Sequence, residues 1–356
     1  MRILLLGDIR PTHLKRWRDY FLERGHTVRT VSLQDDPDDS DHISIDSAVP
    51  VEAFKYYFEK KAVSRIIRDF QPDIVNGHFV TTYGTLGVAS DFHPLVVSMW
   101  GSDILVSPKK SKLHLARVLW VLRNCDLLTS DSDYLTDQAR RLGKFKTRIV
   151  TEPMGIPDEQ FALLSEPIKS DGSGIRTILS TRRLEPLYRV DMLIEALARA
   201  DDRLPSFSCI IAGDGSERER LQALVKEHDL DSIAFVGWKG GRDYIDLLRR
   251  ADIYVSCSES DSTSVSLLEA MAAGTIPVVT DIPGNREWVK NEKTALTFPV
   301  GDVEALTQAI LRAVTDDRLA VKAAARNVKA VESRAIWQKN MASIERAFEE
   351  LVRKQR

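Results

Sequence analysis

The sequence lacks long apolar runs and shows no excess of charge of one sign. No stretch of about 18 apolar residues occurs, so no segment has the length of a transmembrane helix. The 50 Lys and Arg residues are balanced by 52 Asp and Glu residues, giving a formal net charge of −2. General nucleic-acid binders usually carry a clear basic excess. Membrane-spanning and nucleic-acid-binding proteins are therefore disfavoured.

Cysteine is also scarce. The three cysteines, Cys125, Cys209 and Cys257, lie far apart beside apolar runs, and neither a disulfide framework nor a zinc-site spacing can be made from them. No other cluster has the spacing of divalent-metal ligands. The N-terminal apolar run Ile3–Leu6 is shorter than a signal peptide and soon meets Asp8. These features predict a cytoplasmic protein with reduced thiols and no metal site.

What the sequence does contain is a regular alternation of short apolar runs with longer amphipathic segments, which predicts doubly wound parallel sheets. A length of 356 residues suits two domains. A segment with linker chemistry, 161–174, separates two such series. We expect an α/β fold with an N-terminal domain over 1–165, completed by a helix over 336–356 that crosses back to it. A second domain is expected over 166–335, with a ligand crevice between the two. The predicted strands are Ile3–Leu6, Val28–Val31, Ile74–Val75, Leu95–Met99, Leu127–Thr129, Ile149–Val150, Thr177–Ser180, Cys209–Ala212, Ala234–Val236, Ile253–Ser256, Ile276–Val279 and Leu296–Phe298.

The segment Ser256–Val279 carries the strongest functional pattern. It is typical of a strand, a polar loop, a helix and a further strand. Ser262, Thr263 and Ser264 are good N-cap residues, and a helix N-terminus can bind a phosphate. Glu269 follows on an otherwise apolar helix and could accept two hydrogen bonds from a ribose diol. A purely structural explanation of the same spacing is a helix N-cap at Ser262–Ser264 and a pair between Glu269 and a nearby arginine.

The same segment resembles the nucleotide-sugar signature of retaining glycosyltransferase family 4. The resemblance rests on Asp261, seven intervening residues, Glu269, and then Ala270-Met271-Ala272-x-Gly274-x-x-Pro277-Val278-Val279. It implies the GT-B arrangement of two facing Rossmann-like domains, with Glu269 on the ribose and Asp261 on the hydroxyls of the donor sugar. The family usually has a glutamate where this chain has Asp261, and Glu259 lies two residues earlier.

Three further segments resemble family motifs in the expected order. Ser180–Pro186 resembles the segment whose arginine grips the donor diphosphate, here Arg183. The family continues with a lysine and a glycine where this chain has Tyr188 and Arg189. Arg189 could supply the missing charge or could be a solvated residue of a first helical turn. The second segment resembles the glycine turn of the donor domain and points to Gly213 and Gly215. The third resembles the strand end that cradles the nucleotide base and points to Trp238.

The first half carries weaker motifs. His78 follows a predicted strand; alone it could be a histidine satisfied in a turn, but the resemblance implies contact with the transferred sugar. Trp100-Gly101-Ser102-Asp103 resembles a His-Gly-Ser-Asp segment of the family, with Trp100 replacing the histidine. Ser102 and Asp103 could approach the acceptor. Arg10 and His13 stand where the family has a glycine-rich loop, and could contact phosphate or acceptor; His13 could equally belong to a first helical turn.

Two basic segments could contact an anionic membrane surface. The segment Lys109–Arg123 begins with lysines and continues as an apolar helix containing Trp120, and Lys15-Arg16-Trp17-Arg18 is a second basic and aromatic cluster. Basic amphipathic helices can lie on anionic leaflets. A helix that packs on its own sheet and leaves a solvated basic end explains the first segment as well.

The resemblance implies transfer of a sugar from a nucleoside diphosphate donor to an acceptor hydroxyl, with retention of anomeric configuration and without a metal or other cofactor. It favours uridine over guanosine as the nucleotide. A sugar or lipid-linked acceptor and a place in cell-surface polysaccharide or glycolipid synthesis are expected. Two alternatives stay open: a nucleotide-sugar epimerase of the same architecture, and a two-lobed small-molecule binding protein without catalysis.

Overall fold

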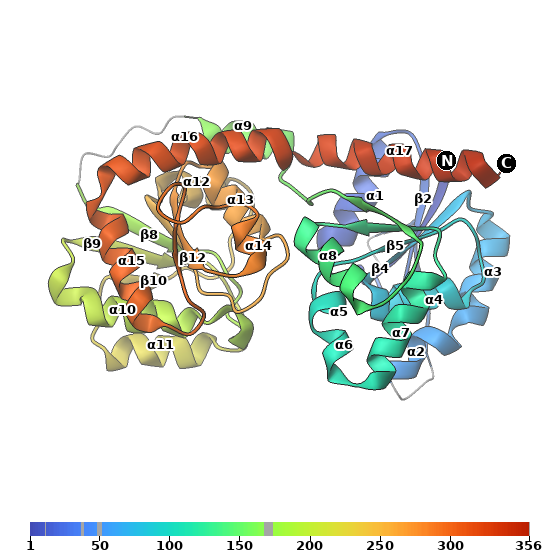
Figure 1. Ribbon diagram of the computed structural model, residues 1–356, viewed down its shortest axis with the longest axis horizontal. Helices are drawn as coiled ribbons and strands as arrows, with labels where there is room; N and C mark the ends of the chain where they lie inside the picture. Colours follow the sequence, from blue (N-terminus) through green and yellow to red (C-terminus); the bar gives the residue numbers. More distant parts are fainter. Residues whose placement is uncertain (11, 37–38, 48–51, 167–173, 356) are drawn as a thin grey trace. The chain divides into compact units, whose positions relative to one another are not determined.

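The computed structural model describes residues 1–10, 12–36, 39–47, 52–166 and 174–355. The chain divides into two units (Figure 1). Unit 1 comprises Met1–Pro153 and Gln338–Arg356, and unit 2 comprises Met154–Trp337. Unit 1 thus ends before the expected boundary at residue 165. Most of the expected linker, residues 167–173, lies outside the described residues.

Unit 1 is built on a seven-stranded parallel sheet of order β3-β2-β1-β4-β5-β6-β7. Its central strands are buried and rich in Val, Ile and Leu, as expected for a parallel sheet covered on both faces. The carboxyl ends of β1, β4 and β5 lead into the loops that hold the candidate residues of this unit. The strands are β1 (Arg2–Leu6), β2 (Thr27–Ser32), β3 (His42–Ser44), β4 (Ile74–His78), β5 (Leu95–Ser98), β6 (Leu127–Ser130) and β7 (Arg148–Thr151).

Helices connect these strands, and one expected helix is divided. The amphipathic spacing of residues 54–70 predicts a single helix, but the segment forms α2 (Glu52–Phe58) and α3 (Lys60–Phe70), separated at Glu59. A π-helical turn (Phe79–Gly84) follows β4 directly. The remaining helices of the first part of the chain are α1 (Thr12–Glu23), α4 (Thr85–Ala89), α5 (Ser102–Leu105), α6 (Ser107–Lys110), α7 (Lys112–Arg123) and α8 (Asp133–Leu142).

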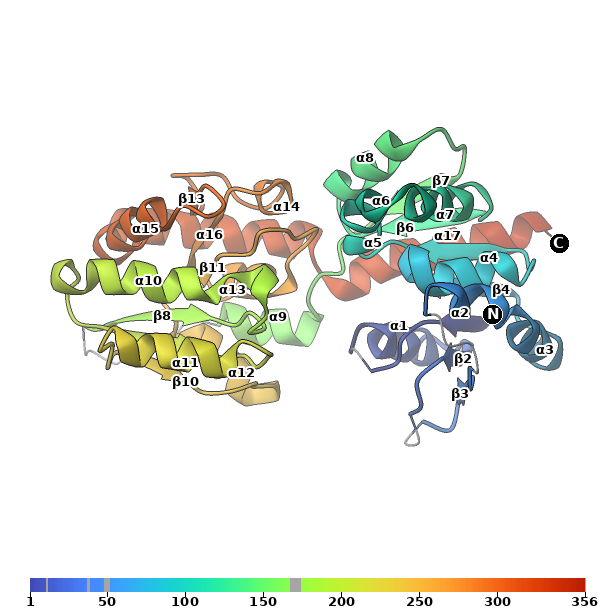
Figure 2. The same ribbon diagram turned by 90° about the horizontal axis from the view of Figure 1, so that it is seen from below.

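Unit 2 contains a six-stranded parallel sheet of order β10-β9-β8-β11-β12-β13 (Figure 2). Its strands are β8 (Arg176–Ser180), β9 (Phe207–Ile211), β10 (Ile233–Phe235), β11 (Ile253–Ser256), β12 (Ile276–Thr280) and β13 (Leu296–Phe298). Its helices are α9 (Asp158–Ser165), α10 (Val190–Ala200), α11 (Arg218–Glu227), α12 (Gly241–Arg250), α13 (Val265–Ala272), α14 (Pro283–Arg286), α15 (Val303–Thr315) and α16 (Asp317–Arg334), with 3₁₀ turns at Pro186–Tyr188 and Asp201–Arg203.

The last helix, α17 (Trp337–Gln355), returns to unit 1 as predicted. Phe348 stacks on Phe21 of α1 with ring centroids 5.6 Å apart. The buried carboxylate of Glu345 accepts hydrogen bonds from the Tyr20 hydroxyl at 2.8 Å and from Arg24 Nε at 3.2 Å, and lies 2.7 Å from His26 Nε2. A stacked pair of rings and one polar cluster therefore fix this helix to α1 and to the turn that follows it.

The predicted α/β class with two parallel sheets is confirmed. The expected strands are present, and β3 is an additional edge strand that the sequence did not indicate. Part of the acidic segment before β3 is paired, with Asp36 bound to Lys15 at 2.7 Å and Asp39 bound to Arg18. Residues 37–38 of that segment lie outside the described residues. Within the described ranges, no helix is both long enough and apolar enough to cross a membrane.

Candidate active site

The centre of the candidate site in unit 2 is Arg182, in the loop after β8. Its guanidinium is almost fully buried and donates from Nη2 to both carboxylate oxygens of Asp261 at 3.0 Å. Its plane lies over the Tyr188 ring, 4.3 Å from the centroid. Burial opposes the charge, but the carboxylate of Asp261 outweighs it and raises the pKa of Arg182. The charge of Asp261 is therefore balanced inside the protein.

Arg182 also reaches the start of α13. Its Nη1 donates to Ser264 Oγ at 2.6 Å and to Ser266 Oγ at 2.9 Å. Ser264 is the N-cap of the helix, and its hydroxyl accepts from the backbone N–H of Leu267. Ser262 is buried and Thr263 half-buried in the preceding loop. The helix start expected from the sequence therefore exists, with an arginine fastened to its cap.

Glu269 lies in the second turn of α13 and is half-buried. The Tyr244 hydroxyl of α12 donates to its Oε2 at 2.6 Å, and Gln160 Nε2 of α9 donates to its Oε1 at 2.8 Å. Burial, followed by the charge of Glu269, raises the pKa of Tyr244 and keeps this phenol neutral. Two neutral donors thus orient a carboxylate that retains acceptor capacity for a ligand hydroxyl.

The two arginines expected at the diphosphate differ in their surroundings. The Arg183 side chain is 75% exposed and lies 3.7 Å from Glu185, a weak pair. Arg189 instead donates to Asp191 at 3.1 Å and to Glu259 at 2.9 Å. These carboxylates already balance its charge. Arg189 also has φ of 47°, in the left-handed region that favours glycine, directly before α10.

Three glycines let neighbouring loops approach the site. A Cβ at Gly213 would stand well under 3.0 Å from the carbonyl oxygen of Arg182, and one at Gly215 equally close to that of Leu184. A Cβ at Gly284 of α14 would collide with the carbonyl oxygens of Asp261 and Ser262. The expected glycine turn therefore supports the Arg182 loop, and Gly284 supports the Asp261 loop.

Trp238 lies in the loop after β10, where the base was expected to bind. It is 75% exposed, although it is the largest side chain of that loop. Its ring covers Gly240, where a Cβ would stand 2.5 Å from the indole. An exposed indole offers a face on which a planar base can stack.

The candidate residues of unit 1 form a cluster of four rings at the ends of β4 and β5. His78 packs edge-on against Trp17 at 4.9 Å and lies 5.6 Å from Trp100, while His13 lies 5.1 Å from Trp100. Neither ring nitrogen of His78 has a hydrogen-bond partner among the described residues. Burial, and secondarily His13, lowers the pKa of His78 to about 3; burial, and secondarily Arg16, lowers that of His13 to about 4. Both imidazoles are therefore neutral at pH 7.

The backbone immediately after His78 is unusual. Phe79 has φ of 71°, a conformation that costs a non-glycine residue free energy. Asp103 fixes this loop, because its buried carboxylate accepts from the N–H groups of Val80 and Gly101, both at 2.9 Å. Burial raises the pKa of Asp103 to about 6. The geometry thus supports a positioning role for Asp103 rather than direct contact with an acceptor.

The other two expected acceptor residues are accessible. Ser102 is exposed at the start of α5. Arg10 is exposed and forms a bidentate pair with Asp8, donating from Nε at 3.0 Å and from Nη2 at 2.6 Å. Such an exposed pair can exchange partners at little cost.

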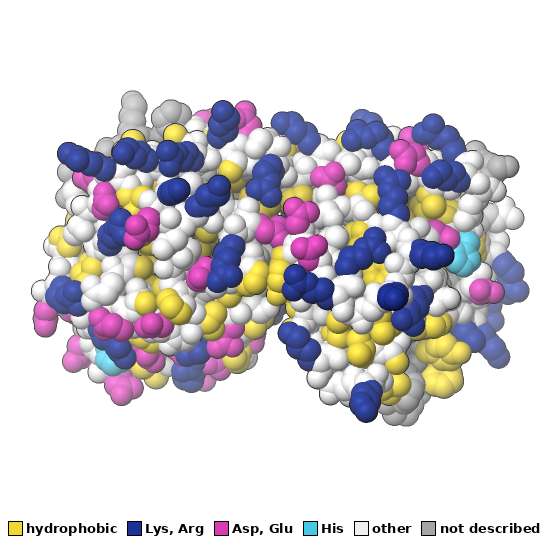
Figure 3. Space-filling model, in the orientation of Figure 1, with side chains coloured by type: hydrophobic (Ala, Val, Ile, Leu, Met, Phe, Trp, Pro, Cys, Tyr) yellow, Lys and Arg dark blue, Asp and Glu magenta, His cyan; other side chains and the backbone are white. Residues whose placement is uncertain are grey.

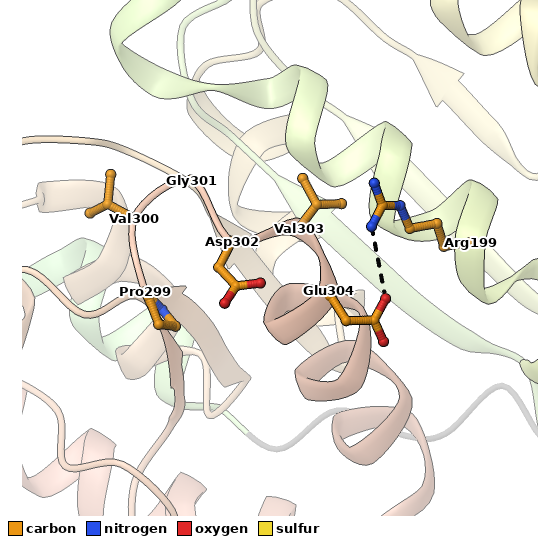
Figure 4. Close-up of a pocket in the computed structure, with 7 residues that line it drawn as sticks. All are labelled: Arg199, Pro299, Val300, Gly301, Asp302, Val303 and Glu304. Atoms are coloured by element: carbon orange, nitrogen blue, oxygen red, sulfur yellow. Dashed lines mark ion pairs between the residues drawn. The ribbon is translucent and has the colours of Figure 1, made fainter.

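Other features of the structure lie apart from these residues. A hollow of about 570 Å³ in unit 2 is lined by Arg199 and the β13–α15 loop (Figure 4). Its one ion pair, Arg199 with Glu304 at 3.8 Å, is largely exposed. None of the candidate residues lines it. In the part of the chain that the structure describes, no group of three or more His, Cys, Asp or Glu residues could hold a metal ion.

The sequence interpretation missed several residues that shape the site. Arg182 was passed over in favour of its neighbour Arg183, because two adjacent arginines give no signal of which is buried. Tyr244 and Gln160 were missed because they reach Glu269 from 25 and 109 residues away along the chain. Ser266 could have been found from the sequence, because it lies two residues after the cap Ser264, in the first turn of the same helix.

Two parallel, doubly wound sheets and a last helix that returns to the first unit define a protein of the GT-B fold. Comparison with known proteins agrees. Residues 168–330 match the family model described as glycosyl transferases group 1, and residues 2–132 match the model described as glycosyl transferase 4-like. The chain belongs to glycosyltransferase family 4, the retaining, nucleotide-sugar-dependent family that its motifs resemble.

Curated relatives include a glycogen synthase of Mycobacterium tuberculosis, 28% identical over 268 residues, or 73% of this chain and 64% of the relative. A putative colanic acid biosynthesis glycosyltransferase of Escherichia coli K12 is 27% identical over 240 residues, or 64% of this chain and 58% of the relative. The matched region thus spans less than two thirds of either relative's length.

Two solved structures show the same fold. A sucrose-phosphate synthase from Thermosynechococcus elongatus has a TM-score of 0.81 at 18% identity, covering 99% of both chains. The crystal structure of Anabaena HepE in complex with UDP and glucose has a TM-score of 0.81 at 17% identity, covering 99% of this chain and 100% of that one. At such identities the similarity establishes the fold.

Proposed function

We propose that this protein transfers a sugar from a nucleoside diphosphate donor to an acceptor hydroxyl with retention of configuration. The observation that carries the proposal is the cluster at the start of α13. There Arg182 joins Asp261 to the helix cap Ser264, one turn before the oriented carboxylate of Glu269. A helix N-terminus for phosphate and a carboxylate for a diol are the two contacts that a nucleoside diphosphate requires.

In this proposal Glu269 accepts from the ribose hydroxyls and the N-terminus of α13 faces the diphosphate. Arg183 supplies positive charge, because it is the exposed arginine of this loop and its pair with Glu185 is loose. Arg189 remains with Asp191 and Glu259 and ties the first turn of α10 to the loop after β11. Trp238 stacks on the base. Gly213 and Gly215 contribute indirectly, because they let their own turn pack closely against the loop that carries Arg182.

The transfer step needs stabilisation of the departing diphosphate and of the positive charge that develops on the sugar. Oriented dipoles and charges achieve this without reorganising water. Asp261, whose charge Arg182 holds in place, would bind the hydroxyls of the sugar, and the neutral imidazole of His78 would contact the sugar as the bond breaks. No residue of this chain is assigned as a covalent nucleophile.

Relatives support a uridine nucleotide, since HepE is described with UDP and glucose and GtfA subunits are named for UDP-N-acetylglucosamine. The colanic acid relative supports a sugar or lipid-linked acceptor in cell-surface polysaccharide or glycolipid synthesis. We place this reaction in the cytoplasm, because all three cysteines are buried and unbridged, as in proteins of reducing compartments.

The experiment is a thermal-shift screen of UDP, GDP and their sugars against the wild type and Glu269→Gln. A ligand at about 100 times its Kd stabilises the folded state by about 2.7 kcal/mol. Loss of the charged acceptor should weaken UDP binding about ten- to a hundred-fold. Gln160→Ala is the matched control, because it removes a neighbour of Glu269 and leaves the carboxylate in place.

Product analysis with the preferred donor separates the alternatives. Formation of a new glycosidic bond with an acceptor supports the proposal. Interconversion of the donor sugar without an acceptor would instead identify an epimerase, and tight binding with no turnover a non-catalytic protein. Equal UDP affinity in wild type and Glu269→Gln would overturn the assignment of Glu269.

A further inference from the structure

Unit 1 carries an apolar surface that its own core does not use. Large hydrophobic side chains are exposed on adjoining segments: Phe58 of α2 is 58% exposed, Leu113 of α7 is 60% exposed, and Tyr57 and Val106 are each 42% exposed. Tyr57 contacts Trp120 of α7 at 6.3 Å between ring centroids. We call Tyr57, Phe58, Val106, Leu113 and Trp120 the α2–α7 patch.

The α2–α7 patch is bordered by positive charge. Lys109, Lys110 and Lys112 are exposed between α6 and the first turn of α7. Between Ile104 and Cys125 the sequence has five Lys or Arg residues and no Asp or Glu. Lys60 lies over the Tyr57 ring at 4.9 Å. Figure 3 shows hydrophobic side chains gathered over α6 and α7 with cationic side chains at their border. This density of cations contrasts with the chain's net charge of −2.

The alternative from the sequence was a helix that only packs on its own sheet. Part of α7 does so, since Val118, Val121 and Leu122 are buried. Leu113 and Ala116 are exposed in its first turns, however, and Trp120 is half-buried beside Tyr57. Packing in unit 1 therefore accounts for one face of α7 and leaves the face toward α2 available.

We propose that the α2–α7 patch docks on the surface of an anionic lipid bilayer, with Phe58 and Leu113 entering the interface and the three lysines on the headgroups. The amino-acid composition of the α2–α7 patch favours a lipid surface over a protein partner. Lysine is depleted in the cores of protein interfaces, whereas aromatic and aliphatic side chains beside several lysines match an anionic leaflet. Unit 1 is also the unit in which the acceptor-side candidates lie, so docking would bring a lipid-linked acceptor to the protein.

The test uses the full chain and flotation with vesicles of phosphatidylcholine alone or mixed with phosphatidylglycerol. Binding is expected to the anionic vesicles at low salt and to fall at about 1 M salt, where the Debye length is about 3 Å. Each surface lysine contributes about five-fold to partitioning, so Lys109, Lys110 and Lys112 changed together to Gln should weaken binding about a hundred-fold. Phe58→Ser with Leu113→Ser should weaken it about ten-fold or more.

The controls change the same residue types elsewhere. Lys290, Lys322 and Lys329 are exposed in unit 2, and their joint change to Gln removes an equal charge. Val321 is 73% exposed on α16. Its change to Ser is the control for the change of Phe58 and Leu113 to Ser. Both controls should bind vesicles like the wild type, and circular dichroism should show all variants folded.

Three results would overturn the proposal. These are absence of vesicle binding at low salt, equal binding to neutral and anionic vesicles, and a loss in the control lysine variant equal to that in the patch variant. A dimer in size-exclusion chromatography that Leu113→Ser dissociates would assign the patch to a second copy of the chain instead. The flotation assay requires neither donor nor acceptor, so its outcome is independent of the proposed sugar transfer.

Discussion

At the scale of single residues, the adjacent Arg182 and Arg183 have opposite properties. Arg182 is locked to a carboxylate and two hydroxyls, whereas Arg183 extends into solvent. A buried pair contributes to stability chiefly in the sense that breaking it leaves an uncompensated charge. An exposed arginine costs little to move and can follow a ligand. Stability and donor binding should therefore depend on different members of this dipeptide.

We predict that Arg182→Gln lowers the free energy of unfolding by about 3 kcal/mol, because Asp261 loses its counter-charge. Arg183→Gln should change stability by less than about 0.5 kcal/mol but weaken UDP binding about ten-fold. Urea denaturation and calorimetric titration with UDP measure the two quantities. A stable Arg182→Gln variant, or an Arg183→Gln variant with wild-type affinity, would contradict the corresponding half of the prediction.

His78 is the second residue whose properties point beyond packing. It is 4% exposed, and neither nitrogen has a partner within the described residues. Burying polar atoms in this way costs free energy, and such a cost is usual where function requires the group. An apolar replacement should remove the cost and the function together.

We expect His78→Leu to raise the free energy of unfolding by about 1 kcal/mol, because it removes buried unsatisfied polar atoms. Its turnover should fall about a hundred-fold or more while the Kd for UDP stays unchanged, since the nucleotide contacts belong to unit 2. Denaturation, steady-state kinetics and UDP titration check the three parts. A purely structural histidine would instead show lower stability with turnover per folded molecule preserved.

At the scale of elements, the loop that carries Asp261 and Ser262 depends on α14. Gly284 of this short helix lies so close to their carbonyl oxygens that no side chain fits between. The same loop is tied to the unit through the pairs Arg182–Asp261 and Arg189–Glu259. The close contact at Gly284 is therefore one of several that fix its position.

Gly284→Ala should displace this loop, lowering the free energy of unfolding by about 1–3 kcal/mol and weakening UDP binding about ten-fold. Gly87→Ala in unit 1 is the matched control. There the added methyl would meet the flexible end of Leu95 at 2.9 Å, and the residue lies in a helix. Unfolding and UDP titration of both variants test the prediction; equal effects at the two glycines would contradict it.

Elements differ in how far their sequence predicts them. The central strands are apolar runs bounded by turn residues, so their positions follow from composition. Strand β3 has only three residues, His42–Ser44, none of them buried, and it exists because it pairs with β2. The division between α2 and α3 leaves no proline or glycine as a signal. Motif order located α13 and Glu269, but the partners of Glu269 depend on how α9 and α12 pack.

At the scale of the whole molecule, unit 1 is built from two separate stretches of the chain, because α17 completes it after unit 2. Met341, Ile344 and Phe348 are buried, and Glu345 joins Tyr20, Arg24 and His26. Unit 1 is therefore complete only with the last helix, while unit 2 is formed by one continuous segment, Met154–Trp337. Motif order along the sequence predicts this return of the chain, but it does not reveal the polar cluster at Glu345.

The buried histidines of unit 1 make the stability of the molecule depend on pH. Burial lowers the pKa of His78 to about 3 and that of His13 to about 4, against 6.5 in an unfolded chain. At a pH between the folded-state and unfolded-state pKa values, the unfolded chain binds more protons than the folded protein. The free energy of unfolding therefore falls as the pH falls below 6.5, and these histidines do not change it above that pH. At pH 5 the loss should be about 2 kcal/mol for each histidine.

We therefore predict that acidification from pH 7 to pH 5 destabilises the wild type by about 4 kcal/mol more than the double variant His13→Gln, His78→Gln. Carboxylates titrate in both proteins and cancel in the comparison. Tryptophan fluorescence during urea denaturation includes a signal from this cluster, because Trp17 and Trp100 contact these histidines. His228→Gln at an exposed position is the control and should keep the wild-type dependence. Equal losses in the wild type and the double variant would mean that protonated imidazole is tolerated inside the ring cluster, and with it a charged His78 during sugar transfer.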